Sequence, residues 1–350
     1  MNKSQLIFIW FANSEPHKFR RRLLGWYRRH ARDLPWRASC DPYRVWLSEI
    51  MLQQTRVAAV LEHYREFLRR FPTVEKLAAA RESSVLAAWS GLGYYRRARM
   101  LHAAAKLIVR EHGGSFPSTT EGLRALPGIG RYTAAAIASI AFDEPVAVVD
   151  GNVERVLQRV SGKPLAGEQF WEAANHLLHK NRPGDFNQAM MELGAMACTP
   201  RSPSCLTCPV AELCATRGEL AVTTKPARQN KREIHYSLDF RKKNFSEKDF
   251  RIPEPSNGNH RAGEVFLVQR ARSASLMPGM WELPELEATN GQAIAWLTLR
   301  HSITTTDYTV RVWQPPTPSR VRGKWIPVQR LEQIALTGLA RKILRKAEVL

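Results

Sequence analysis

The chain has 350 residues, a length that predicts two domains. Hydrophobic residues make up 44% of it and charged residues 24%, which excludes a mainly disordered protein. The 52 basic and 32 acidic residues leave a net charge of +20, and this indicates a polyanionic partner, with nucleic acid as the first candidate. Acidic lipid is the other candidate, but no apolar run reaches the length of about 18 residues that spans a bilayer, so we expect no membrane partner.

The ends and the cysteines bear on the cellular compartment. Four of the five cysteines fall between Cys198 and Cys214, which is ligand spacing rather than a secreted disulfide framework and indicates a reducing compartment. The opening stretch, MNKSQLIFIWFANSEP, has no small-residue cleavage site, and we interpret it as a tail or a helix start. Residues 19–37 are Arg-rich like a mitochondrial transit peptide, but they run directly into a motif used below. We therefore expect no targeting segment.

The first part of the chain, from about residue 19 to 218, predicts one helix after another. Apolar residues recur every three or four positions in segments rich in Ala, Leu and Arg, and Gly and Pro separate these segments. The periodic windows are residues 45–71, 74–91, 95–113 and 133–142. The sequence therefore predicts an all-α domain over residues 1–220.

The second part of the chain has a different pattern. Residues 221–233 are polar, basic and poor in helix formers, which predicts a linker. Beyond them, β-branched and aromatic residues partly alternate and predict strands over residues 234–240, 264–269, 302–313 and 323–327. The last residues, ALTGLARKILRKAEVL, predict a basic amphipathic helix. Residues 234–350 are thus expected to form a smaller α+β domain.

Four cysteines follow one another as C-x6-C-x2-C-x5-C and are candidate metal ligands: Cys198, Cys205, Cys208 and Cys214. Four thiolates in one short loop can surround a tetrahedral ion or a cubane, and ligation by thiolate alone selects zinc or iron–sulfur. Structural zinc usually shows two C-x2-C pairs, and only one occurs here, so the spacing favours iron–sulfur. Four unligated thiols are the alternative. Cys40 lies outside the pattern, and we expect it in the core.

A glycine-rich segment, LPGIGRYTA at residues 126–134, stands directly before a predicted helix. Its glycines, Gly128 and Gly130, permit close approach of a backbone, and the free N–H groups of the following helix attract a phosphate. This pattern predicts a helical hairpin that holds DNA independently of sequence, with an ordinary structural turn as the alternative. Twenty residues after Gly130 comes Asp150, which ends an apolar run and precedes Gly151. An Asp at such a place is often only an N-cap, but the neighbouring motifs favour a functional role.

The hairpin, Asp150 and the cysteine loop, in this order and spacing, resemble the helix-hairpin-helix DNA glycosylases that carry a [4Fe-4S] cluster, the endonuclease III and MutY group. Three independent motifs carry the resemblance, and the match in order and spacing extends across the predicted helical domain. It implies an all-α glycosylase domain with the hairpin at residues 126–134 and an iron–sulfur loop at residues 198–214. It also implies one [4Fe-4S] cluster, held by the four cysteines, and double-stranded DNA as the partner.

Further segments resemble the adenine-excising MutY branch of this group. These are LPWR at residues 34–37, WLSEIMLQQT at 46–55 and GLGYY at 91–95. In the second part, FLVQR at 266–270 and LMPGMWELP at 276–284 are similar to the Nudix-like C-terminal domain of MutY. No Glu-rich metal box follows, so the resemblance implies a DNA-recognition domain rather than a hydrolase.

The residue at position 132 bears on the type of reaction. Bifunctional members of the group carry a Lys in the hairpin helix, and this chain has Tyr132 there. Without an amine, no imine to the sugar forms at this position. The resemblance thus implies a monofunctional glycosylase with little or no lyase activity.

Two carboxylates in unlike surroundings carry the expected chemistry. Glu49 lies within an apolar segment, so burial is expected to raise its pKa and keep it protonated as a general acid. By resemblance, it protonates N7 of adenine. Also by resemblance, Asp150 stays ionised and stabilises the oxocarbenium-like sugar, or forms a transient covalent bond to it as in retaining glycosidases. An exposed helix glutamate and an N-cap aspartate are the alternative interpretations.

Adenine must leave the duplex to be reached, at a cost of about a few kcal/mol. By resemblance, Leu52 and Gln54 lie at the wedge that opens the stack, and Tyr94 intercalates beside the opposite base. The residues implied to line the base pocket or lie near the adenine are Arg32, Arg37, Tyr132, Asn152 and Glu192. The remaining predicted DNA contacts are Gln53, Thr55, Gly128, Gly130, Thr304 and Thr305.

The chain departs from the MutY pattern in its second part. The branch reads the opposite 8-oxoguanine with a Phe-Ser-His turn, whereas residues 303–305 here are Ile-Thr-Thr. Thr305 is shorter than His but can still make one hydrogen bond to a base edge. We expect preference for 8-oxoguanine over guanine to be weaker or to come from other residues.

The resemblance implies a base excision repair enzyme that hydrolyses the N-glycosidic bond of adenine opposite 8-oxoguanine or guanine. We expect a monomer in the bacterial cytoplasm, associated with the nucleoid through DNA. The alternatives are an endonuclease III-like glycosylase on oxidised pyrimidines and a non-catalytic iron–sulfur protein that binds DNA. Tyr132 and the second domain argue against the first, and the two carboxylates argue against the second.

Overall fold

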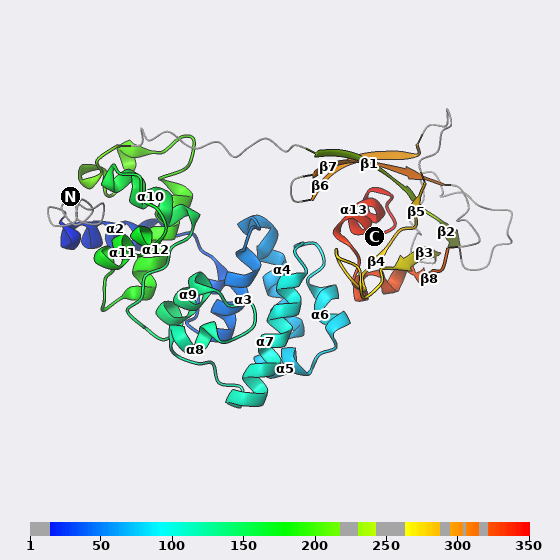
Figure 1. Cartoon of the computed structure of the whole chain (residues 1–350), viewed down its shortest axis with the longest axis horizontal. Helices are drawn as coiled ribbons and strands as arrows, with labels where there is room; N and C mark the ends of the chain where they lie inside the picture. Colours follow the sequence, from blue (N-terminus) through cyan, green and yellow to red (C-terminus); the bar gives the residue numbers. More distant parts are fainter. Residues whose placement is uncertain (1–14, 218–229, 243–262, 288–294, 304–305, 315–320) are drawn as a thin grey trace. The chain divides into compact units, whose positions relative to one another are not determined.

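The structure is a computed structural model, and it describes residues 15–217, 230–242, 263–287, 295–303, 306–314 and 321–350. The described residues fall into two compact units. Unit 1 contains those within Met1–Ala78 and Ala103–Thr224, and unit 2 those within Ala79–His102 and Lys225–Leu350. Each unit is described by itself below, with the elements labelled as in Figure 1.

The described chain up to residue 217 contains helices and no strands, as predicted (Figure 1). Its α-helices are α2 (Pro16–His30), α3 (Pro42–Leu52), α4 (Val57–Arg70), α5 (Val74–Ala79), α6 (Glu82–Ala88), α7 (Arg96–His112), α8 (Thr120–Arg124), α9 (Arg131–Ala141), α10 (Gly151–Ser161), α11 (Glu168–Leu177) and α12 (Pro183–Met196). Short 3-10 helices are η1 (Pro35–Arg37), η2 (Cys205–Thr207) and η3 (Ala211–Leu213).

The predicted helical window at residues 45–71 is two helices, α3 and α4. The break follows from Gln54, whose φ of 55° lies in the left-handed region that ends a right-handed helix. Two apolar segments therefore meet at a sharp turn that carries residues 53–56. The window at 74–91 is also two helices, α5 and α6, and Arg81, in an extended conformation, is the N-cap of α6.

Helix α10 shows how local sequence and packing combine in unit 1. It begins at Asp150, whose side chain caps it, and ends at Gly162, whose φ of 66° makes it a left-handed C-cap. Its buried face packs against α12. A Cβ on Gly194 of α12 would lie 2.6 Å from Cβ of Asn152, so only glycine allows the two helices to approach this closely. The same hydrophobic core includes residues of α2 and α11, and each fully buried large side chain contributes about 1.5–3 kcal/mol.

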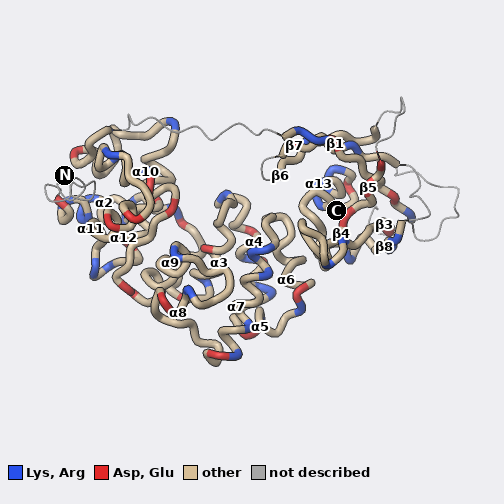
Figure 2. The backbone as a smooth tube through the Cα atoms, in the orientation of Figure 1, with Lys and Arg blue, Asp and Glu red and all other residues tan. Residues whose placement is uncertain are grey.

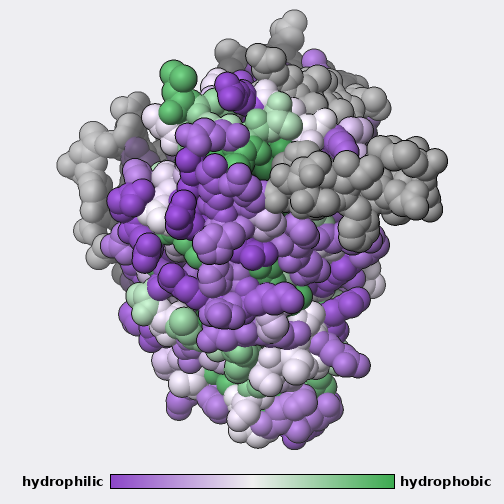
Figure 3. Space-filling model, turned by 90° about the vertical axis from the view of Figure 1, so that its left-hand side faces the viewer, coloured by the Kyte–Doolittle hydropathy of each residue, from purple (hydrophilic) through white to green (hydrophobic). Residues whose placement is uncertain are grey.

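Helix α2 of unit 1 has a polar and an apolar face. His17, Arg21 and Arg28 are exposed, whereas Phe19, Leu23 and Trp26 are buried in the core. Figure 3 shows one face of the molecule, on which hydrophilic residues predominate and apolar residues form small patches. This division between a polar and an apolar face is what the three- and four-residue periodicity predicts.

Unit 2 contains two small sheets. The strands are β1 (Asn230–Ser237), β2 (Phe240–Lys242), β3 (Gly263–Gln269), β4 (Trp281–Glu282), β5 (Glu285–Leu286), β6 (Leu297–Ile303), β7 (Thr306–Trp313) and β8 (Lys324–Pro327). One sheet has the order β5-β1-β7-β6, in which β1 and β7 are parallel and the other pairs antiparallel. The other has the order β2-β3-β4, with β8 also paired to β3. The predicted strand at 302–313 is instead the end of β6 followed by β7, because the chain reverses between Ile303 and Thr306.

The C-terminal helix α13 (Gly338–Lys346), preceded by η5 (Val328–Gln333), completes the core of unit 2. It is amphipathic, as predicted, and buries Leu339, Ala340, Ile343 and Leu344. These side chains share one hydrophobic cluster with residues of both sheets.

The connection between α6 and α7 also belongs to unit 2. Ser90 Oγ and Tyr95 Oη both donate to the carbonyl oxygen of Leu336, at 3.1 and 3.0 Å. Residues 79–102, within the region predicted as the helical domain, thus join the strand-containing unit. The boundary predicted at 221–233 stays a prediction, since residues 218–229 lie outside the described chain, and β1 begins at Asn230.

One expectation about the core is wrong. Cys40 is exposed rather than buried. It lies between η1 and α3, where the connection runs over the surface to Asp41, the N-cap of α3. A connecting segment keeps its backbone polar groups in contact with water, and this places Cys40 outside the core.

Candidate active site

Glu49 and Tyr132 form a buried pair between α3 and α9. Glu49 is 6% exposed, and Tyr132 Oη donates a 2.7 Å hydrogen bond to its Oε2. Burial raises the pKa of Glu49 to about 7, which outweighs the lowering by the Tyr132 hydrogen bond, while the nearby negative charge of Asp150 raises it further. The pKa of Tyr132 is raised well above its usual value, first by burial, so its hydroxyl stays neutral. Glu49 is therefore buried as its apolar neighbours predict, and it changes charge near neutral pH.

Asp150 is the N-cap of α10. Its Oδ1 accepts from the backbone N–H groups of Asn152 and Val153 at 2.9 and 2.8 Å, and its Oδ2 accepts from Asn152 Nδ2 at 3.0 Å. The capping role considered from the sequence is thus real. It does not exclude a second role, because a carboxylate has about four lone-pair sites and three hydrogen bonds are formed here. The cap holds a negative charge at a defined place near Glu49, whose pKa it raises.

Glu192 is buried like Glu49, but its hydrogen-bond donors are charged. It is fully buried in α12 and accepts hydrogen bonds from two guanidinium groups, Arg32 Nη2 at 2.7 Å and Arg37 Nη2 at 2.8 Å. Arg32 adds Nε and its backbone N–H, each at 2.9 Å. Burial raises the pKa of Glu192, but the hydrogen bonds from Arg32 and Arg37 outweigh it and hold the pKa at about 2. Three residues predicted near the adenine thus form one ion-paired cluster that stays charged.

The turn after α3 holds the other residues of the QQT motif. Gln53 Nε2 donates to Thr133 Oγ1 of α9 at 3.2 Å, and Thr55 Oγ1 donates to the carbonyl of Gln53 at 3.2 Å. Gln54 is exposed, and Leu52 is half-buried. The turn is therefore joined to the helix that follows the hairpin, with the Gln54 side chain open to solvent.

The glycine-rich segment connects α8 to α9, as the hairpin interpretation predicts. Gly128 has a φ of 77°, in the left-handed region that favours glycine. Gly130 is the N-cap of α9, and nothing lies within 4 Å of the Cβ it lacks. Both glycines are exposed. An open helix N-terminus with exposed backbone is suited to a phosphate.

Tyr94 and the two threonines are the remaining predicted DNA contacts. In unit 2, Tyr94 lies before α7 with a φ of 48° and is 50% exposed, an uncommon state for an aromatic side chain. The guanidinium of Arg97 lies 5.4 Å from its ring centroid. Thr304 and Thr305 lie outside the described residues.

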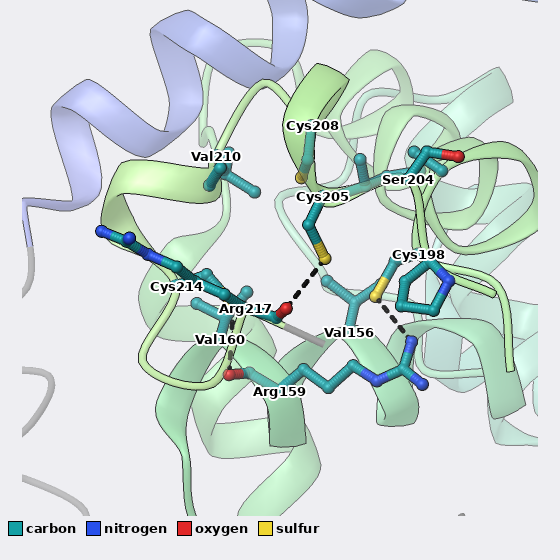
Figure 4. A pocket seen from close by; sticks show the side chains of 14 residues that line it. Val156, Arg159, Val160, Cys198, Ser204, Cys205, Cys208, Val210, Cys214 and Arg217 are labelled. Atoms are coloured by element: carbon teal, nitrogen blue, oxygen red, sulfur yellow. Dashed lines mark hydrogen bonds between the residues drawn. The ribbon is translucent and has the colours of Figure 1, made fainter. Parts of the chain in front are cut away.

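The four cysteines line one small pocket between α10, α12 and the loop that follows α12 (Figure 4). Burial raises the pKa of Cys208 to about 11 and also raises that of Cys205. A thiol with a raised pKa becomes a ligand only beside a group that supplies compensating positive charge. Four thiols that line one pocket are the donor set that an iron–sulfur group takes.

Two arginines of α10 that the sequence analysis missed tie the cysteine loop to the site. Arg155 donates to Asn152 Oδ1 at 2.9 Å, to the Gly194 carbonyl at 2.7 Å and to the Cys198 carbonyl at 2.8 Å. Arg159, 3% exposed, donates to the carbonyls of residues 199 and 200 and reaches Cys198 Sγ at 3.4 Å (Figure 4). Two arginines four residues apart in an amphipathic helix are the pattern that could have identified them.

Comparisons with known proteins agree with these features. Residues 47–169 match the family of HhH-GPD superfamily base excision DNA repair proteins. Residues 198–214 match the iron–sulfur binding domain of endonuclease III. The predicted helix-hairpin-helix domain and iron–sulfur loop are thereby confirmed. No helix among the described residues is long and apolar enough to cross a membrane.

Individual relatives are similar over most of the chain. An adenine DNA glycosylase of Homo sapiens is 40% identical over 318 residues, covering 78% of this chain and 58% of its own length. One of Schizosaccharomyces pombe is 34% identical over 331 residues, covering 79% and 71%. A solved structure of a thermostable thymine-DNA glycosylase has 30% identity and a TM-score of 0.55, over 59% of this chain and 97% of that one. The chain spans about 60% of the length of the mammalian relatives it matches.

Proposed function

Because the chain belongs to the MutY-type adenine DNA glycosylases of the HhH-GPD superfamily, we propose that it excises adenine from duplex DNA by hydrolysis of the N-glycosidic bond. The proposed substrate is adenine opposite 8-oxoguanine or guanine. The observation that carries the proposal is the pair of carboxyl groups, Glu49 and Asp150, which are electrostatically coupled but held in different surroundings. In such a pair, one carboxyl group is protonated and acts as an acid, while the other stays ionised and stabilises positive charge.

Glu49 acts as the general acid. Its pKa of about 7 leaves a large fraction protonated at neutral pH and still makes it acidic enough to transfer the proton. The neutral hydroxyl of Tyr132 holds one carboxyl oxygen in place at 2.7 Å. The proton goes to N7 of the flipped adenine, which then departs as a neutral base.

Asp150 stabilises the positive charge that develops on the sugar. The hydrogen bonds from the α10 backbone fix the position of its carboxylate before the reaction, so that no reorganisation is needed in the transition state. Water then completes the hydrolysis. Because position 132 is Tyr, no amine is present there to form an imine, and we infer that strand cleavage does not accompany base release.

The arginine cluster and the cysteine loop position these groups. Glu192 holds Arg37 in a fixed orientation, and the charge of Arg37 lowers the pKa of Glu49. We infer that Cys198, Cys205, Cys208 and Cys214 hold one [4Fe-4S] cluster, which cross-links the loop when bound. Purified protein should then absorb visible light and contain iron and sulfide in equal amounts. A colourless protein that holds one zinc ion would contradict this assignment.

The activity is tested by single-turnover cleavage of end-labelled duplexes with A opposite 8-oxoguanine, G, C or T. A duplex with T opposite G tests the activity named for the thymine-DNA glycosylase relative. We expect breaks at A only after alkali treatment, with A opposite 8-oxoguanine or G cleaved fastest. Release of thymine without adenine, or breaks that form without alkali, would overturn the proposal.

The two roles of Asp150 can be separated by a pair of variants. Asp150→Asn retains a good N-cap residue and removes the negative charge, whereas Asp150→Ala removes both. We expect both variants to lose base excision, and only Asp150→Ala to lose a further ~1 kcal/mol of stability. If Asp150→Asn excised adenine at the original rate, the aspartate would serve only as a cap.

A further inference from the structure

A basic pocket of about 580 Å³ lies in unit 2 between α13 and the turn at Gly91. Its lining residues are Gly91, Gly338, Arg341, Lys342, Arg345, Lys346 and Glu348. Four of them carry a positive charge and one a negative charge. The pocket shares no residue with the candidate active site.

Helix α13 directs all four cations to its face away from the core. Leu339, Ala340, Ile343 and Leu344 are buried, whereas the basic residues occupy positions 341, 342, 345 and 346 (Figure 2). Like charges four residues apart repel each other, and each such pair costs about 0.2–0.5 kcal/mol in a helix. The helix dipole favours a cation in the last turn but does not account for the two in the preceding turn. An anion in the pocket would relieve this repulsion.

Two of the four cations make hydrogen bonds that orient this face. Arg341 Nε donates to Ser90 Oγ at 2.8 Å, and Lys342 Nζ donates to the carbonyl of Arg300 at 2.6 Å. Both acceptors are uncharged. Arg345 and Lys346 are exposed and form no salt bridge within the described part of the chain. The pocket therefore presents the charges of Arg345 and Lys346 to solvent.

The turn that closes the pocket also leads to Tyr94. Gly91 has a φ of 111° and lines the pocket, and three residues later the half-exposed Tyr94 ring projects from the same loop. The loop is tied to the start of α13 because Ser90 and Tyr95 both donate to the carbonyl of Leu336. Hydrogen bonds thus join the loop that carries the exposed ring to the start of the basic helix.

We infer that this pocket binds a backbone phosphate of the duplex at the Tyr94 loop, and this rests on the proposed function. An exposed ring that enters a base stack needs the neighbouring backbone to be held, and guanidinium and ammonium groups on a helix supply that contact without reading sequence. Arg345 and Lys346 carry the phosphate contact, whereas Arg341 orients the face against Ser90. The pocket thus gives unit 2 a contact to the DNA backbone that does not depend on the lesion.

The test measures DNA affinity of the full chain against salt concentration. The variant Arg345→Gln/Lys346→Gln removes two exposed charges from α13, and Arg322→Gln/Lys324→Gln removes two exposed charges elsewhere in unit 2. The slope of log K against log salt is negative, and each lost phosphate contact makes it less steep by about 0.9. We expect the α13 variant to reduce the steepness of the slope by about 0.9 to 1.8, equally for mispaired and fully paired duplexes. The control variant should reduce it less.

Three outcomes would overturn the inference: an unchanged slope in the α13 variant, an equal fall in both variants, or a loss confined to mispaired DNA. Pyrophosphate, added as a free anion at constant ionic strength, distinguishes the other source of phosphate. If it bound the pocket and duplex DNA did not, the ligand would be a free phosphate rather than DNA. Absence of excision by the unaltered chain would refute the proposed function but leave the slope comparison intact.

Discussion

Two buried glutamates in unit 1 have opposite electrostatic properties. Glu49 is 6% exposed and Glu192 fully buried, yet the pKa of Glu49 is raised to about 7 and that of Glu192 lowered to about 2. Burial raises both values. The difference comes from the partners, since Glu49 accepts from a neutral tyrosine hydroxyl and Glu192 from two guanidinium groups.

This contrast shows that burial alone does not decide which carboxyl group is an acid. A buried carboxylate with charged donors stays ionised and acts as a structural anion that orients its partners. A buried carboxyl with one neutral donor is free to gain and lose a proton near neutral pH. In the proposed site, Glu49 therefore transfers the proton and Glu192 positions the arginines.

The largest expected effect is that of Glu49→Gln on excision. Glutamine keeps the shape and can accept the Tyr132 hydrogen bond but has no proton to transfer. We expect the single-turnover rate to fall by about 10²–10⁴ while DNA affinity is retained. An undiminished rate in this variant would remove Glu49 from the general-acid role. The control is Glu66→Gln, because Glu66 lies in α4 and forms ion pairs with Arg69 and Arg70 at the surface.

The corresponding change at the other glutamate should act mainly on stability. Glu192→Gln leaves two guanidinium groups facing a neutral side chain, and we expect the free energy of unfolding to fall by about 3 kcal/mol. This is the low end for a broken buried pair, since the Arg32 side chain is 36% exposed. Urea unfolding followed by circular dichroism measures the loss. As a control, Glu212→Gln breaks the exposed pair with Arg22 and should change the free energy of unfolding little. An equal loss of stability in both variants would show that the buried Glu192 cluster stabilises the fold no more than an exposed ion pair.

The two glutamates should also give stability opposite dependences on pH. The folded pKa of Glu192 is depressed, so its contribution is present above the ordinary value of 4.5 and is lost as pH falls through about 2. The folded pKa of Glu49 is raised, so its contribution is present below 4.5 and is lost as pH rises through about 7. The free energy of unfolding of the Glu49→Gln variant, relative to that of the unaltered chain, should therefore rise by up to about 3 kcal/mol between pH 4.5 and pH 8. Parallel pH curves for the two proteins would contradict the raised pKa.

The smallest effect is expected from Tyr132→Phe. The Tyr132 hydroxyl lowers the pKa of Glu49 by hydrogen bonding, so its removal should raise that pKa further. A hydrogen bond to a charged group is worth about 1.5 kcal/mol or more, which corresponds to about one pH unit. The alkaline limb of the single-turnover rate should therefore move upward by about one unit. A downward shift would mean that the hydroxyl does not act on the ionised form of Glu49.

Much of the fold could be predicted because its causes are local. Periodicity identified the helices α7 and α9 to within two residues, and the Pro-Gly punctuation placed the hairpin turn. The turn at Gln54 was missed because its left-handed backbone has no distinctive sequence, and β4 and β5 were missed because each contains only two residues. Short strands exist through their pairing with distant segments rather than through their own composition.

The sequence by itself determined the residue types of the site and their order: two carboxyl groups, a tyrosine in place of an amine, two glycines before a helix and four clustered cysteines. Only the tertiary structure decided which of them meet. Tyr132 contacts Glu49 across 83 positions of the chain, and Arg32 contacts Glu192 across 160. Capping and periodicity depend on neighbours within one or two turns, whereas the pKa of a buried group depends on whichever side chains the packing brings against it. For this reason the chain predicted an acid at residue 49, and packing decided that its partner is neutral while that of Glu192 is charged.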